Sequence, residues 1–116
     1  MKLLSRTEEM ILLSVFALKE NAYGLAIREQ LTKVSGKRFS VGAVYVPLER
    51  LEERGMLTSH EAEPTPERGG RSKRYFQLST KGEEALEEIR LIHEAMWKGY
   101  AALEGSKYSA LMRILG

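Results

Sequence analysis

A compact cluster of cations is the feature of this sequence best suited to bind another molecule. Between Glu67 and Arg74 the chain carries four basic side chains against one acid. They are Arg68, Arg71, Lys73 and Arg74. A local excess of positive charge suits a polyanionic partner such as the phosphate backbone of a nucleic acid. A solvated charged loop explains this charge equally well, so the cluster takes its meaning from the elements around it.

Residues able to carry out catalysis are scarce. The chain has two histidines, His60 and His93, which lie far apart in sequence, and it has no cysteine. Gly69-Gly70 falls in an expected hairpin, where no helix N-terminus is available to hold a phosphate. We therefore expect no enzyme activity, no cofactor and no metal site.

Length and composition predict one small domain with an appended helix. The chain has 116 residues, of which 43% are hydrophobic and 29% are charged. No apolar run approaches the roughly 20 residues of a bilayer span, and the N-terminus does not resemble a signal peptide. Absence of cysteine fits a reducing compartment, so a cytoplasmic location is expected. Residues 1–80 hold 13 Lys and Arg against 10 Asp and Glu, whereas residues 81–116 hold 5 against 6, so the basic excess is N-terminal.

Hydrophobic spacing and capping signals predict the order of the elements. The capping-box pair Ser5 and Glu8 opens a first helix that continues to about Lys19 and is apolar nearly all round. A second helix is expected at 25–34 and a third at 41–54, after the N-cap Ser40. Strands at 57–63 and 74–78 flank a loop, and a second capping box at Thr80 opens a long helix to about residue 103. A short helix is expected at 106–115.

This order predicts a mainly α fold with a small β-hairpin (α+β). Residues 1–80 would form a winged helix-turn-helix DNA-binding domain, and residues 81–116 a C-terminal dimerisation helix followed by the short terminal helix. The hairpin with its basic tip would be the wing.

The third helix is the expected DNA-reading element. Its first turns carry Ser40, Gly42 and Tyr45, which combine small size with hydrogen-bonding groups, and Lys37 and Arg38 precede it where phosphates would pass. A plain core helix with a polar outer face would give a similar pattern. Pro47 inside the helix removes a backbone donor and is expected to kink it.

Three blocks of sequence resemble the PadR family of transcriptional regulators. Residues 40–57, SVGAVYVPLERLEERGML, are similar to the family's recognition helix, although Ala43 replaces a usual threonine and Val46 separates Tyr45 from Pro47. Residues 69–82, GGRSKRYFQLSTKG, are similar to its wing, and Tyr23-Gly24 with Ile27 resembles the start of its second helix. The resemblance covers about residues 3–103 and implies a DNA-binding repressor. The DNA-binding residues expected from pattern and resemblance together are Lys37, Arg38, Ser40, Gly42, Tyr45, Arg68, Gly70, Arg71, Lys73 and Arg74.

The long final helix carries an apolar seam. Its spacing of three and four residues is typical of an interface between paired helices. The expected interface consists of Leu86, Ile89, Ile92, His93, Met96, Tyr100 and Leu103. The resemblance implies pairing of this helix with its twin in a homodimer, with the first helix beside it. An intramolecular helix folded onto the wing domain is the alternative.

His93 and Trp97 of this helix also suggest an effector site. The resemblance implies that a small aromatic effector could bind between the paired helices, beside His93 and Trp97. Both residues could instead be interface core. A homodimer would bind double-stranded DNA at an inverted repeat. A winged-helix regulator of the MarR type, or a protein-interaction module that does not bind DNA, remains as an alternative.

Overall fold

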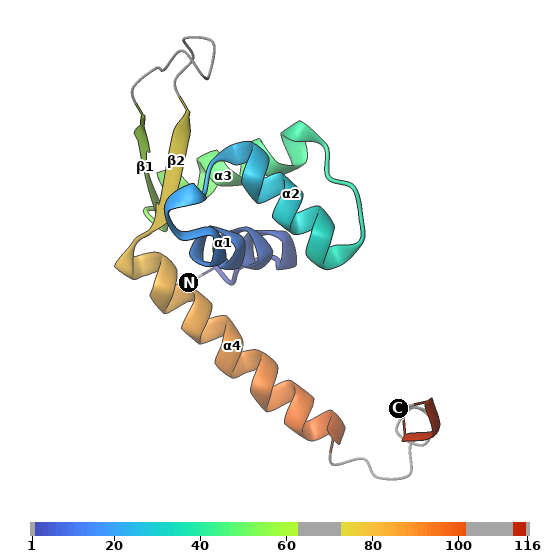
Figure 1. The fold of residues 1–116 in the computed structure, drawn as a ribbon. Coiled ribbons are helices and arrows are strands. Elements are labelled where there is room, and N and C mark those ends of the chain that lie inside the picture. The colour runs from blue at the N-terminus through green and yellow to red at the C-terminus, as the bar shows by residue number, and fades with distance from the viewer. Residues whose placement is uncertain (1, 63–72, 102–112, 116) are drawn as a thin grey trace.

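The computed structural model describes residues 2–62, 73–101 and 113–115, and its elements follow the winged helix-turn-helix order (Figure 1). They are α1 (Arg6–Leu18), the 3-10 turn η1 (Lys19–Asn21), α2 (Gly24–Ser35), α3 (Val41–Glu53), β1 (Leu57–Glu61), β2 (Arg74–Leu78) and α4 (Thr80–Ala101). The predicted mainly α fold with one hairpin is confirmed. Residues 113–115 are helical, and the rest of the expected terminal helix lies outside the described residues.

Local capping explains where the helices begin. Ser5 and Glu8 form both hydrogen bonds of the predicted capping box. The Ser40 hydroxyl accepts a hydrogen bond from the Ala43 N–H at 3.1 Å, so Ser40 caps α3 as expected. The capping box predicted at Thr80 is wrong by one residue. Ser79 is the cap, because its hydroxyl accepts from the Gly82 N–H at 3.0 Å while donating to the Gly55 carbonyl.

The two strands form an antiparallel hairpin in the register Leu57↔Leu78 to Glu61↔Arg74. The second strand spans the predicted residues, whereas the first ends at Glu61, two residues before its expected end. The tip of the wing, residues 63–72, lies outside the described part of the chain. The root of the wing is joined to the helices, because the Phe76 N–H donates to the Ala22 carbonyl at 2.8 Å.

A single apolar core joins all these elements. The fully buried side chains include Ile11, Leu12, Ile27, Leu31, Val44, Leu48, Leu51 and Leu57. Ala85 and Ile89 of α4 belong to the same core, so the first half of α4 packs on the winged domain. Helix α1 packs against α2, α3, α4 and β2, and Leu13 and Phe16 remain exposed on its free side.

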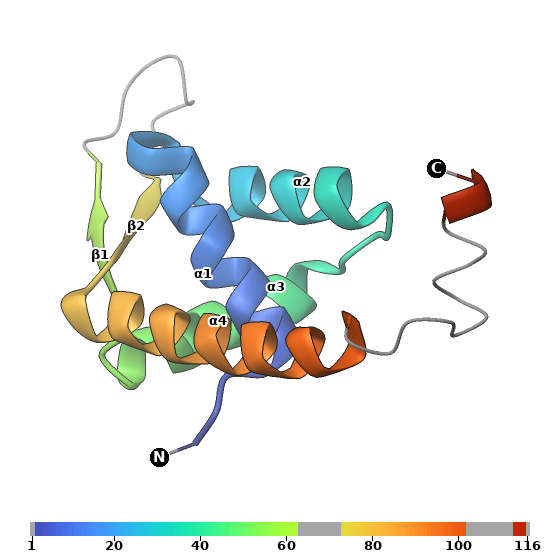
Figure 2. The same cartoon turned by 90° about the horizontal axis from the view of Figure 1, so that it is seen from below.

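The second half of α4 stands away from the domain in Figure 1, whereas Figure 2, seen from below, shows α4 passing across α1 and α3. Every residue from Glu94 to Ala101 is exposed. The start of α4 is held tightly instead, because a β-carbon at Gly82 would lie 2.2 Å from the Met56 carbonyl oxygen. In the described part of the chain, no helix combines the length and the apolar character needed to cross a bilayer.

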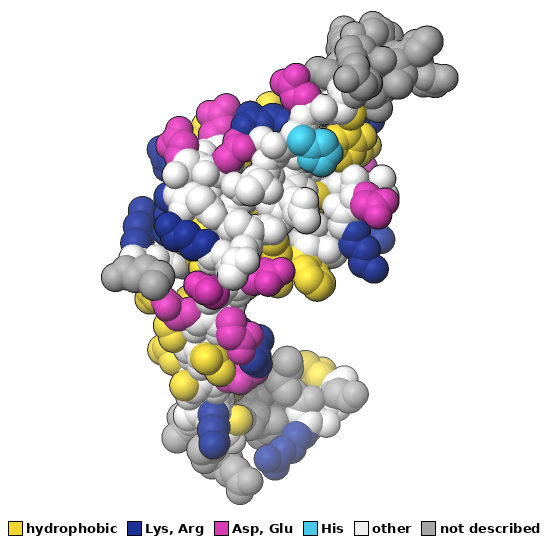
Figure 3. Space-filling model, turned by 90° about the vertical axis from the view of Figure 1, so that its left-hand side faces the viewer, with side chains coloured by type: hydrophobic (Ala, Val, Ile, Leu, Met, Phe, Trp, Pro, Cys, Tyr) yellow, Lys and Arg dark blue, Asp and Glu magenta, His cyan; other side chains and the backbone are white. Residues whose placement is uncertain are grey.

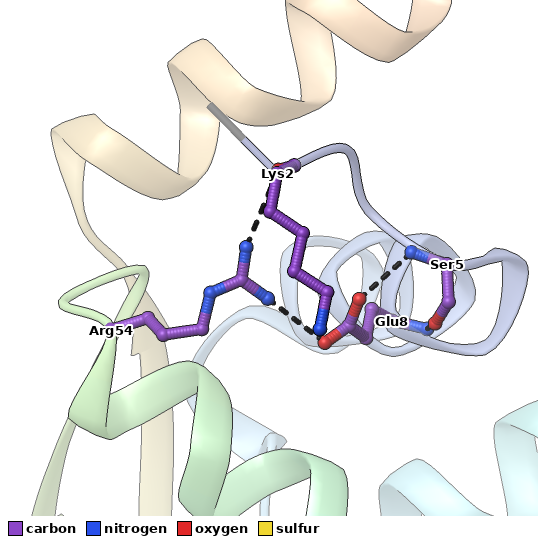
Figure 4. A network of polar contacts seen from close by, with 4 residues as sticks. All are labelled: Lys2, Ser5, Glu8 and Arg54. Carbon is purple, nitrogen blue, oxygen red and sulfur yellow. Dashed lines mark hydrogen bonds and ion pairs between the residues drawn. The ribbon is translucent and has the colours of Figure 1, made fainter.

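An ion pair connects the start of α1 to the end of α3 (Figure 4). Arg54 Nη1 lies 3.0 Å from Glu8 Oε2, and the Glu8 side chain is largely buried. Burial alone would raise the pKa of the Glu8 carboxyl. Hydrogen bonds with the backbone and hydroxyl of Ser5, together with the charges of Arg54 and Lys2, outweigh burial and lower that pKa.

Candidate nucleic-acid interface

One side of α3 is anchored in the core while the other faces outward. Val44, Leu48 and Leu51 are fully buried, as their spacing predicted. The opposite side of the first turns is exposed, including Val41, Gly42 and Val46. Pro47 lies within an unbroken helical segment, so the fold retains α3 as one element. The helix therefore presents a small, uncharged surface to a partner.

Gly42 leaves this surface open to close approach. A β-carbon at Gly42 would meet no atom within 4 Å in the described structure. Ser40 uses its hydroxyl oxygen as the helix cap, and its hydroxyl proton remains able to donate outward. A groove edge or a phosphate could therefore lie close to the backbone at this end of α3.

Tyr45 lies between the recognition helix and α2. It is 40% exposed, and its ring covers Gly24, the first residue of α2. The predicted Tyr23-Gly24 motif therefore has a packing role, because a larger residue at 24 would overlap this ring.

The cations before α3 are exposed on an ordered turn. Lys37 and Arg38 both face solvent. Arg28 Nε donates to the Phe39 carbonyl at 2.6 Å, and the Lys37 N–H donates to the Ser35 hydroxyl at 3.0 Å. These bonds hold the turn beside the N-terminus of α3, where sequence reasoning expected phosphates to pass.

The two described cations of the wing differ in their surroundings. Lys73 Nζ lies 4.0 Å from the centroid of the Tyr23 ring. Arg74 forms an ion pair with Glu52 of α3 and donates to the Ser59 hydroxyl. The sequence did not predict this pairing, because no local signal connects a helix end to a strand. Arg68, Gly70 and Arg71 lie outside the described residues.

The expected interface residues of α4 fall into two groups. Leu86, Ile89 and Ile92 pack against the core of their own chain, and His93 Nε2 lies 3.1 Å from Glu9 Oε1 on α1. Met96 and Tyr100 are exposed beyond the domain, and Leu103 lies outside the described residues. Figure 3 shows hydrophobic side chains gathered on this lower part of the molecule.

Trp97 belongs to the exposed group. It is 65% exposed and makes an edge-to-face contact with Tyr100, with ring centroids 5.4 Å apart. His93 lies one turn earlier on the same helix, and its ring is directed toward Glu9 of α1.

Comparison with known proteins shows to which family this arrangement of helices and strands belongs. A family model described as "Transcriptional regulator PadR-like family" matches residues 12–88. The chain belongs to this family. PadR-like proteins are DNA-binding transcriptional regulators and not enzymes, and the match decides between the PadR and MarR alternatives. No curated protein is similar enough in sequence to count as a relative.

Solved structures share the PadR-like fold at low sequence identity. A PadR-family regulator from Eggerthella lenta has 24% identity and a TM-score of 0.66, with 84% of this chain and 83% of that chain covered. A transcriptional regulator from Clostridium thermocellum has 17% identity and a TM-score of 0.68, covering 84% and 89%. A Streptococcus transcriptional regulator has 21% identity and a TM-score of 0.68, covering 84% and 91%.

Proposed function

We propose that this PadR-like protein is a homodimeric repressor that binds an inverted-repeat operator. In this proposal α3 enters the major groove and the wing lies along the neighbouring backbone. The exposed first turns of α3 carry the proposal, because they present hydrogen-bonding and small side chains beside exposed cations while the buried stripe fixes the helix in the domain.

The proposed contacts divide into two kinds. Lys37, Arg38, Lys73 and the tip residues Arg68, Gly70 and Arg71 would meet the phosphate backbone, which positions the protein and makes binding salt-dependent. Ser40, Gly42 and Tyr45 would face base edges and select the sequence.

The exposed half of α4 supports the homodimer. Met96, Trp97 and Tyr100 form an apolar surface beyond the domain, and Leu13 and Phe16 expose a second apolar surface on α1. Exposed apolar patches of this kind mark interaction sites. A second copy of the chain would bury both surfaces across a two-fold axis, with the partly buried Leu86 and Ile92 at the inner end of the interface. Two recognition helices would then read half-sites about 10 base pairs apart, or a multiple.

The effector proposal rests on the aromatic pair. Trp97 and Tyr100 offer exposed ring faces and edges on which a flat aromatic effector could stack. Such a ligand between paired α4 helices would change their spacing and release the operator. His93 would act from the domain side of this site, through its contact with Glu9.

The proposal is tested by selecting binding sites from a random pool of duplex DNA with the full chain. We expect an enriched inverted repeat. Lys37→Ala should then weaken binding and reduce the slope of log affinity against log salt by about 0.9, because one phosphate contact is lost. Lys98→Ala, which removes one exposed cation from the part of α4 that extends beyond the domain, is the matched control and should leave the slope unchanged. Failure to enrich any site, with no salt-dependent binding, would favour a protein-interaction module instead.

A further inference from the structure

We propose that Arg74 is a positioning residue that holds the wing against the recognition helix through Glu52, and that it is not a phosphate contact. This inference rests on the proposed DNA-binding function and names a different role for one cation that the sequence assigned to DNA. We call Glu52, Ser59 and Arg74 the wing clamp.

The wing clamp joins three elements by hydrogen bonds and one ion pair. Arg74 Nε on β2 donates to Ser59 Oγ on β1 at 2.9 Å. Arg74 Nη2 pairs with Glu52 Oε1 at the end of α3, and the Ser59 hydroxyl donates to Glu52 Oε2. Both carboxylate oxygens and two nitrogens of the guanidinium group are therefore engaged within the chain.

The direction of the Arg74 side chain follows from the strand. Side chains alternate between the faces of a β-hairpin, and the register places Ser59 opposite Phe76 and Glu61 opposite Arg74. Ser59, Arg74 and Phe76 therefore share one face of the hairpin. Phe76 is buried in the core, so that face packs toward the helices. The Arg74 guanidinium carbon lies 5.3 Å from the centroid of the Phe76 ring. Lys73, on the other face, lies over Tyr23.

The charged groups nearby also differ between Arg74 and Lys73. Arg74 is paired with the carboxylate of Glu52, and the side chains of the two residues are 43% and 28% exposed. To reach a phosphate, Arg74 would have to leave Glu52 and Ser59 and expose an acid beside the DNA. Among the described residues, the Lys73 ammonium group lies over an aromatic ring and pairs with no carboxylate, so its charge stays available.

The wing clamp holds the end of the hairpin nearest the tip, where Glu61 pairs with Arg74, so it sets the direction in which the two strands lead into the tip relative to α3. When α3 lies in the major groove, this direction decides whether the tip cations reach the backbone. The clamp therefore affects affinity through geometry and not through its own charge.

The variant Glu52→Gln should change DNA affinity in opposite directions, depending on whether Arg74 contacts phosphate or positions the wing. If Arg74 contacts phosphate, removing an acid near DNA relieves repulsion and frees the arginine, so binding tightens. If the clamp positions the wing, binding weakens by about two- to fivefold, the range set by a half-exposed ion pair. The probe is a duplex carrying the site that the wild-type protein selects. Glu53→Gln removes the neighbouring exposed acid, with the same change in charge, and should not weaken binding.

Arg74 variants separate charge from geometry. Arg74→Lys keeps the charge but lacks the planar fork that engages both partners, so we expect it to weaken binding as Glu52→Gln does. Arg74→Gln should change affinity and salt slope to the same extent as Arg74→Lys, because both variants break the wing clamp, whereas Lys73→Gln should lower the slope by about 0.9. The Glu52→Gln/Arg74→Gln double variant should bind as weakly as either single variant and no more weakly.

The outcomes are distinct. Tighter binding by Glu52→Gln, a wild-type affinity for Arg74→Lys, or a salt slope that Arg74→Gln reduces and Arg74→Lys does not would each overturn the clamp while leaving DNA binding intact. A wild-type protein that selects no site would overturn the proposed function and the clamp with it. Circular dichroism and thermal melting of each variant show whether the domain is folded, and Arg74→Lys remains a valid test if Arg74→Gln unfolds.

Discussion

The hydroxyl of Tyr45 lies over the α-carbon of Gly24, so close that a β-carbon on Gly24 would be 2.0 Å from the hydroxyl oxygen. The α-carbon of Gly24 is thus in direct contact with a side chain of the recognition helix. The pair joins the first residue of α2 to a residue that we propose reads bases.

Gly24→Ala should move Tyr45 without unfolding the domain. The ring atoms Cζ and Cε1 would also overlap the new methyl group, so the ring must swing outward, which its partial exposure permits. We expect a loss in unfolding free energy of about 1 kcal/mol, the low end for overpacking, because the exposed ring can move aside. Affinity for the selected site should fall at least about fivefold, because one base contact is worth roughly 1 kcal/mol or more. On a Tyr45→Ala background, which has already lost the ring, Gly24→Ala should have no further effect on affinity; a further loss would show that Gly24 acts by another route.

Gly42→Ala should raise stability and lower DNA affinity together. The residue lies in a helix with no atom within 4 Å of a β-carbon position, so alanine gains up to about 1 kcal/mol of helix stability. The added methyl group would occupy the space through which DNA approaches the backbone. Thermal melting and mobility shifts measure the two effects, and the gain in stability excludes misfolding as the cause of weaker binding. Unchanged affinity would remove Gly42 from the interface.

Glu8→Gln should destabilise the protein at neutral pH and not at acidic pH. Glutamine keeps an acceptor for the cap but loses the charge that faces Arg54, at a cost of about 1 kcal/mol. Because the pKa of Glu8 is lowered in the folded state, its stabilisation is complete above the ordinary value of 4.5 and is lost as pH falls through the lowered pKa. Urea unfolding at several pH values tests this. Glu29→Gln, at an exposed acid on α2, should show no pH-dependent difference in unfolding free energy from the wild type. A Glu8→Gln variant that is still less stable than the wild type at acidic pH would contradict the role of charge.

Met96→Glu should abolish the dimer and leave the domain folded. The side chain is 72% exposed in the single chain, so no packing inside the domain is lost. In a dimer it would place two like charges near the two-fold axis, which costs several kcal/mol. Sedimentation should show a monomer with near-normal circular dichroism and lost operator binding. Lys98→Glu, about opposite Met96 on the exposed half of α4, is the control and should remain dimeric. A dimeric Met96→Glu variant would move the interface elsewhere.

The sequence by itself determined the elements whose signals are local. Ser5 with Glu8, and Ser40, mark helix starts because the capping bonds join residues three apart. The apolar stripe of α3 and the strand β2 follow from spacing that one element can show alone. Together with the motif blocks, these signals were sufficient for the fold class and the PadR-like family.

Tertiary structure decided which residues meet across elements. Arg74 is 22 residues from Glu52, and Tyr45 is 21 residues from Gly24, so neither pairing has a local pattern. The cap of α4 moved to Ser79 because its hydroxyl also bonds to the distant Gly55 carbonyl. The apolar seam of α4 is another case in which the partner depends on the tertiary structure. Its spacing shows that one face is apolar, but spacing cannot tell whether the partner is the same chain or another. Only the packed structure shows that Ile89 enters the core of its own chain while Met96 remains exposed, since burial depends on what lies opposite and not on the helix itself.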